Sequence, residues 1–82
     1  MTIKECILEN FKKMFNNVGI PCNEFFKASV KEYIGIECEI LERTKTIMVI
    51  KLLFSDEPMT IRCTFRETEN VTKFISNIEL IN

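Results

Sequence analysis

Four cysteines are the residues of this sequence with the greatest intrinsic reactivity. Cys6, Cys38 and Cys63 fall on apolar stripes, where a thiol packs as a small hydrophobic group and is an unlikely nucleophile. Cys22 follows Pro21 in a connecting segment and is the one thiol that we would test for reactivity. The spacing is wide and irregular, and nothing marks the chain as secreted, so we expect all four thiols to be reduced.

Other chemistry would need residues that the sequence does not supply. There is no histidine and no C-x-x-C pair, so a structural zinc site is not expected. Glu37 and Glu39 share one face of a predicted strand, but no apolar enclosure accompanies them, as a tuned carboxylate pair would require. Two glycines cannot form a glycine-rich phosphate loop. We therefore expect no catalytic, metal or cofactor site, and a binding module rather than an enzyme.

Length and charge further restrict the classes of protein to which this chain could belong. The 82 residues suffice for one domain, residues 1–82, near the size where a single core is only just adequate. A net charge of −1 and a pI of about 5.5 argue against nucleic-acid binding, which favours a basic surface. No apolar run approaches the roughly 20 residues that cross a bilayer, and the N-terminus is polar, so we expect a cytoplasmic protein that binds no membrane.

Residues 47–54 form the stretch around which the elements are arranged, because they are apolar on both alternating faces. We expect them to be the central strand of a sheet. Residues 32–41 and 59–66 alternate with period two and predict the flanking strands. Residues 42–46 and 55–58 are polar and rich in turn-favouring types, and they predict the two hairpin connections.

Helices are predicted before and after this meander in the sequence. Thr2-Ile3-Lys4-Glu5 matches a capping box and begins a helix that Asn16, Asn17 and Gly19 should end. Thr68 or Asn70 is expected to cap a last helix with an apolar stripe at Val71, Phe74, Ile75 and Ile78. The predicted fold is α+β in the order αβββα, with both helices on one face of the sheet.

Residues 20–31 are either a short helix capped by Asn23 or a connector, and the sequence leaves both open. Phe25 and Phe26 are adjacent and therefore point in different directions in any regular structure. At most one of them is readily buried in the same core. The other is expected to be exposed.

One face of a narrow sheet would remain uncovered by two helices, and we predict that it binds a protein. Its centre is apolar and its flanks carry opposite charges; the predicted binding residues are Glu37, Glu39, Ile47, Val49, Lys51, Leu53, Arg62 and Arg66. The same strip could instead be an ordinary solvated face, with long Glu and Arg stems over good strand formers. A homodimer that pairs two open faces or edge strands is a further alternative.

The order helix, three strands, helix also resembles double-stranded RNA-binding domains. That resemblance implies a basic cluster at the start of the last helix. The corresponding residues 67–73 contain one lysine, Lys73, so RNA binding is a lesser alternative.

Size, composition and element order together resemble small phage-encoded anti-CRISPR inhibitors. The segment Val71-Thr72-Lys73-Phe74-Ile75-Ser76 is similar to a last-helix sequence in one type II member, and the Ile-, Lys- and Asn-rich usage suits an AT-rich phage gene. The resemblance implies an inhibitor that acts in the host cytoplasm, with a Cas nuclease or another defence protein as its partner. A net charge of −1 departs from the strongly acidic members that mimic DNA.

Overall fold

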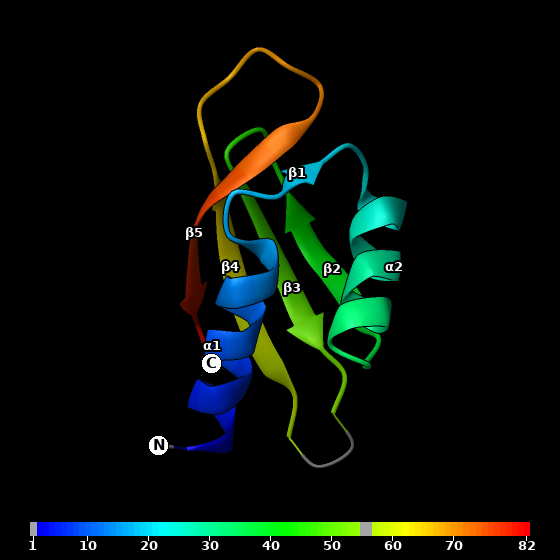
Figure 1. The fold of residues 1–82 in the computed structure, drawn as a ribbon, viewed down its shortest axis with the longest axis vertical. Helices are drawn as coiled ribbons and strands as arrows, with labels where there is room; N and C mark the ends of the chain where they lie inside the picture. The colour runs from blue at the N-terminus through cyan, green and yellow to red at the C-terminus, as the bar shows by residue number, and fades with distance from the viewer. Residues whose placement is uncertain (1, 55–56) are drawn as a thin grey trace.

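Seven elements form an α+β fold with one antiparallel sheet (Figure 1). The computed structural model describes residues 2–54 and 57–82. The elements are α1 (Ile3–Phe15), β1 (Gly19–Ile20), α2 (Asn23–Tyr33), β2 (Cys38–Arg43), β3 (Ile47–Leu52), β4 (Met59–Phe65) and β5 (Lys73–Leu80). The strand order is β1-β5-β4-β3-β2, and both helices lie on the same side of the sheet. The predicted class is confirmed, whereas the predicted αβββα order is not the order observed.

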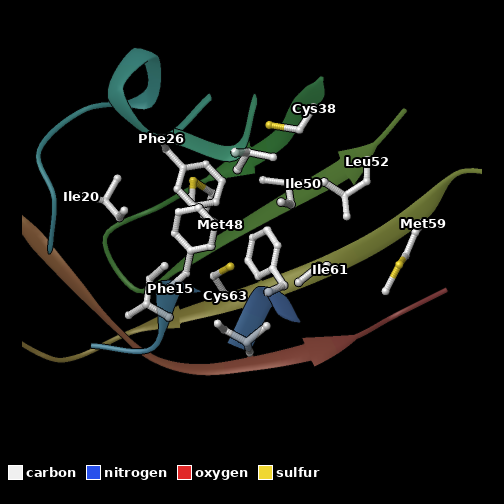
Figure 2. Packing of buried hydrophobic residues seen from close by; sticks show 14 of the residues in the cluster. Phe15, Ile20, Phe26, Cys38, Met48, Ile50, Leu52, Met59, Ile61 and Cys63 are labelled. Atoms are coloured by element: carbon white, nitrogen blue, oxygen red, sulfur yellow. The ribbon is translucent and has the colours of Figure 1, made fainter. Parts of the chain in front are cut away.

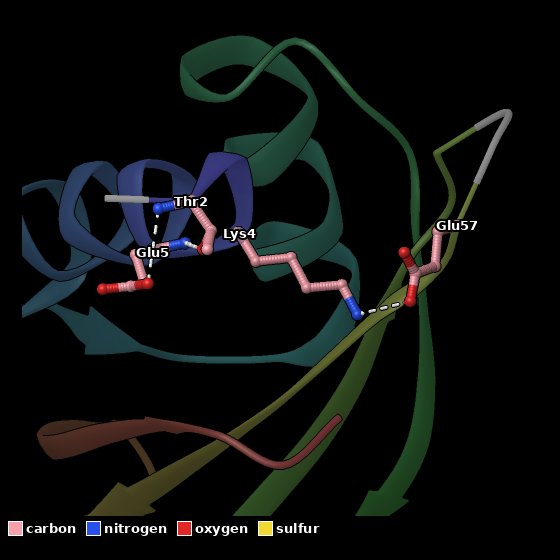
Figure 3. A network of polar contacts seen from close by, with 4 residues as sticks. All are labelled: Thr2, Lys4, Glu5 and Glu57. Atoms are coloured by element: carbon pink, nitrogen blue, oxygen red, sulfur yellow. Dashed lines mark hydrogen bonds and ion pairs between the residues drawn. The ribbon is translucent and has the colours of Figure 1, made fainter.

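Helix α1 begins with the predicted capping box (Figure 3). The Glu5 amide donates to Thr2 Oγ1 at 3.1 Å, and the Thr2 amide donates to Glu5 Oε1 at 3.3 Å. These bonds satisfy amide groups that the first helical turn leaves without intrahelical partners. At the other end Asn17 adopts a left-handed φ of 64°, which turns the chain toward β1.

Residues 20–31, which the sequence left open, contribute most of helix α2. The helix buries Phe26 and Val30 and continues through Tyr33, so the predicted first strand begins later than expected, at Cys38. Gly35 follows the helix with a φ of 83°. Its amide donates to the carbonyl oxygens of Val30 and Lys31, which ends the helix as a left-handed glycine commonly does.

The strands β2, β3 and β4 pair as an antiparallel meander around the predicted central strand. Met48, Ile50 and Leu52 point toward the helices and are fully buried, as the alternation predicts. The register of β2 shifts between Ile40 and Glu42, so this edge strand carries a β-bulge. The turn predicted over residues 55–58 lies partly outside the described residues.

The predicted last helix is wrong, because residues 73–80 form strand β5 against β4. Ile75 and Ile78 are both buried although they are three residues apart, a spacing that suggests a helix. The register of the β4–β5 pair shifts between Thr64 and Phe65, and this irregularity turns both isoleucines toward the core. A strand with a register shift can therefore bury residues three positions apart, a spacing that is typical of a helix.

The core lies between the sheet and the two helices (Figure 2). Phe26 of α2 lies 5.3 Å from the ring centre of Phe15 and 6.1 Å from that of Phe11, both on α1. These rings are at most 1% exposed, and they join the two helices at the base of the helical layer. Burial of this trio against the strands fixes the spacing between α1 and α2.

Candidate functional site

The open face of the sheet is the surface that the sequence singled out, and charged residues lie beside its apolar strip. Val49 lies opposite Arg62, and Lys51 lies opposite Glu39. Arg62 also forms an ion pair with Glu79 of β5. Ile47, Val49 and Lys51 are only partly exposed. This arrangement is typical of a solvated sheet face rather than of a contiguous apolar patch.

Three of the predicted residues border a hollow beside α2, and one of them, Glu39, also lies opposite Lys51 on the open face. Glu37, Glu39 and Leu53 line an open hollow of about 490 Å³ beside α2, with Lys27 and Lys31 on its helical wall. Lys31 Nζ and Glu37 Oε1 are 4.0 Å apart and exposed, and such a pair contributes little to stability. Glu37 and Leu53 therefore belong to this charged hollow rather than to the strip around Val49, and Glu39 borders both.

Arg66 contacts the α1–β1 connection and β5. Its guanidinium donates to the side-chain oxygen of Asn17, the residue that follows the end of α1, and its amide donates to the Phe74 carbonyl oxygen. Arg66 therefore joins the end of β4 to β5 and to the α1–β1 connection.

A groove between α1 and α2 is the main apolar surface feature that the sequence reading missed. Its middle hollow, of about 290 Å³, is lined by Ile7, Asn10 and Met14 of α1, by Tyr33 of α2, and by Ile34 and Phe54. Met14 is 48% exposed and Tyr33 is 58% exposed. Large apolar side chains with this exposure on both walls leave the groove open to a partner.

Two further hollows extend the groove in opposite directions. The first, of about 280 Å³, shares Met14 and Tyr33 with the middle hollow and adds Phe15, Val18, Phe25, Ser29 and Glu32. The second, of about 210 Å³, shares Ile7 and Phe54 and adds Ile3, Lys4 and Glu57. Because neighbouring hollows share lining residues, the three adjoin one another along α1. We call them together the interhelical groove, although the hollow that contains Ile3 is bounded by Phe54 and Glu57 rather than by α2.

The groove arises because each helix has a broader apolar face than the core can cover. On α1, Phe11 and Phe15 face the sheet, whereas Ile3 and Met14 lie to one side of them. On α2, Phe26 is fully buried and its neighbour Phe25 is 45% exposed. The expectation that one phenylalanine of this pair is exposed is confirmed. That adjacency was the only sequence signal of the groove, since an apolar helical stripe is usually core.

At the end of the groove that contains Ile3, two charged side chains form an ion pair. Lys4 Nζ and Glu57 Oε1 lie 2.9 Å apart across the hollow that contains Ile3 (Figure 3). In the opposite end hollow Glu32 is the one charged side chain. Among the described residues Glu32 forms no ion pair. The groove therefore carries one uncompensated carboxylate, at the end bounded by Phe25.

The buried thiols are poor nucleophiles. Burial, assisted by the nearby Cys38, raises the pKa of Cys63 to about 12, and burial also raises the pKa of Cys38 despite Lys27. Both thiols therefore stay protonated near neutral pH and unreactive. Cys22 is exposed, and Cys6 is exposed as well, so the prediction that Cys6 packs as a core thiol is wrong. Residues 2–54 and 57–82 hold no group of three or more Cys, Asp or Glu arranged to bind a metal ion.

The side chain of Arg43 lies over a buried aromatic ring. The Arg43 guanidinium lies 4.4 Å from the ring centre of Phe65, and burial lowers the pKa of Arg43. This contact covers a buried ring and forms part of the structural framework.

No protein-family model matches the sequence, and no match was found among curated proteins or among solved structures. Within the described part of the chain, no helix is long and apolar enough to cross a membrane.

Proposed function

We propose that this protein is a non-enzymatic protein-binding module whose docking surface is the interhelical groove. The observation that carries the proposal is a row of three adjoining hollows along α1, in which Met14, Phe25 and Tyr33 are each about half exposed. Exposed apolar surface of this extent is costly in water and is commonly found where another protein binds.

The open sheet face is the less favourable docking surface. Val49 lies between Glu42 and Arg62 in the register of the sheet, and Arg62 is already paired with Glu79. A partner would have to displace these charged side chains before it reached the apolar strip, which adds a desolvation cost. The groove walls, by contrast, present apolar and aromatic side chains directly.

A capture experiment with matched variants tests this assignment. Wild-type protein, Met14→Lys and Val49→Lys would be immobilised and exposed to a lysate of the native host, and the retained proteins quantified by mass spectrometry. We expect Met14→Lys to lose partners that the wild type and Val49→Lys retain, because a charge placed in the groove disfavours burial of an apolar partner. All three proteins should give the same circular dichroism spectrum.

The opposite pattern would overturn the proposal. Loss of partners with Val49→Lys but not with Met14→Lys would transfer the docking surface to the open sheet face. Retention of the same partners by both variants would show that neither surface is used.

A narrower form of the proposal is that the partner is a bacterial defence nuclease. Its support is the similarity of residues 71–76 to an anti-CRISPR sequence, although here residues 73–76 belong to strand β5 rather than to a helix. We propose host cytoplasm as the site of action on the same ground. Cas nuclease cleavage measured with and without the protein tests this form, and cleavage at an unchanged rate would refute it.

A further inference from the structure

We propose that the occupant of the interhelical groove is an amphipathic helix of a partner protein that places a basic side chain next to Glu32. This inference rests on the proposed function and adds the shape and the charge of the partner segment. It follows from the backbone of the groove walls, from the length of the groove and from its one uncompensated charge.

The groove walls favour a helix over an extended segment. One wall is α1 (Ile3–Phe15) along the whole groove, and the facing wall is α2 from Phe25 to Tyr33, followed by Ile34, Phe54 and Glu57. The interior backbone groups of both helices are already hydrogen-bonded within the helix. An extended segment would bring its own unpaired amides and carbonyls into a groove whose described lining residues include none that belongs to a strand. A helix satisfies its backbone internally and presents only side chains, as in the helix-in-groove mode of recognition.

The length of the groove corresponds to a short helix. Its three hollows lie along α1, from Ile3 near the N-terminus to Met14 and Phe15 near the C-terminus. Thirteen residues of α-helix at 1.5 Å each extend about 20 Å. A partner helix of about three to four turns, with apolar residues spaced at three and four positions, would therefore place one apolar anchor in each hollow.

The charged residues at the two ends of the groove indicate which charge the partner helix should carry. At one end Lys4 and Glu57 neutralise each other at 2.9 Å, so that end has no preference for either sign. At the other end Glu32 lines the same hollow as Phe25 and Met14 and has no oppositely charged partner among the described residues. A lysine or arginine at that end of the partner would complement the carboxylate.

Designed peptides provide the test. Two 15-residue peptides, held helical by a side-chain crosslink on their polar face, would carry identical leucines at positions 4, 8 and 11, and either lysine or glutamate at positions 1 and 15. Placing the same charge at both ends makes the comparison independent of the direction of binding. Fluorescence anisotropy would give the dissociation constant of each peptide, and amide chemical shifts would locate the site.

We expect the lysine peptide to bind the groove roughly tenfold more tightly than the glutamate peptide, from one attraction gained and one repulsion avoided. Glu32→Lys should reverse this preference. Glu24→Lys is the matched control, because it makes the same change of charge on α2 at an exposed residue that does not line the groove, and it should leave most of the preference intact.

Other outcomes would overturn the inference. Equal binding of the two peptides, or an equal response to Glu32→Lys and Glu24→Lys, would refute the role of Glu32. Absence of binding to the groove, with capture still dependent on Met14, would refute the helical occupant and leave the proposed function standing. Shifts of groove amides with protein concentration alone would show that a second copy of this chain occupies the groove.

Discussion

Phe25 and Phe26 are neighbours of the same type in opposite environments. The ring of Phe26 packs against Phe15 with 5.3 Å between centres, whereas Phe25 is 45% exposed in the wall of the interhelical groove. The sequence predicts that only one of them is buried, because adjacent helical side chains diverge by about 100°. Which one is buried depends on how α2 docks against α1, and this docking is a tertiary property that local sequence does not contain.

The Cys63 thiol gives a prediction for stability at high pH. Its pKa is about 12 in the folded protein and 9.0 when unperturbed, so between these values the unfolded state has lost a proton that the folded state keeps. The free energy of unfolding should therefore decrease as the pH rises from about 9 toward about 12, by at most about 4 kcal/mol for this one group. Urea denaturation at a series of pH values measures the slope.

Cys63→Ala is the control for this prediction. The alanine variant leaves a small cavity and will be less stable at every pH, but it has no ionisable group at this position. Its stability should decrease less steeply above pH 9 than that of the wild type. Parallel slopes would contradict the assignment of the effect to Cys63.

At the scale of the elements, the sequence predicted α1 and the antiparallel pairing of β2, β3 and β4 because their patterns are local, although it began the first strand at residue 32 instead of Cys38. The capping box at Thr2 and the alternation around Ile50 depend on residues close in the chain. The last helix was predicted wrongly because Ile75 and Ile78 have helical spacing. The irregular pairing with Thr64 and Phe65 that accommodates this spacing in a strand is a contact between distant segments.

The end of α2 depends on the backbone freedom of Gly35. Its φ of 83° is disfavoured for residues with a Cβ, although a Cβ built there meets no described atom within 4 Å. Gly35→Ala should therefore lower the free energy of unfolding by about 1 to 2 kcal/mol through backbone strain alone. Chemical denaturation measures the loss.

Comparing Gly35→Asn with Gly35→Ala separates the cost of the left-handed φ from any other cost of replacing the glycine. Asparagine tolerates the left-handed region better than alanine, as Asn17 does at a φ of 64° after α1. Gly35→Asn should therefore lose less stability than Gly35→Ala. An alanine variant as stable as the wild type would show that this φ is not required in solution.

At the scale of the whole molecule, placing both helices on one side of the sheet creates two candidate surfaces, the open sheet face and the interhelical groove, and the sequence indicated only the first. It predicted correctly that Ile47, Val49 and Lys51 point away from the helices. It could not show that Arg62 and Glu79 pair across the same face, because β5 was not expected. The interhelical groove was likewise hidden, since its position depends on the Phe11, Phe15 and Phe26 trio.

The central claim is that the groove is open in the free protein and available to a different protein. Molar mass by light scattering over a concentration series, on the wild type and on Met14→Lys, tests it most directly. We predict the monomer mass of 9.6 kDa for both proteins at every concentration. A wild-type dimer that Met14→Lys converts to monomer would contradict the claim, because the groove would then be covered by a second copy of the chain.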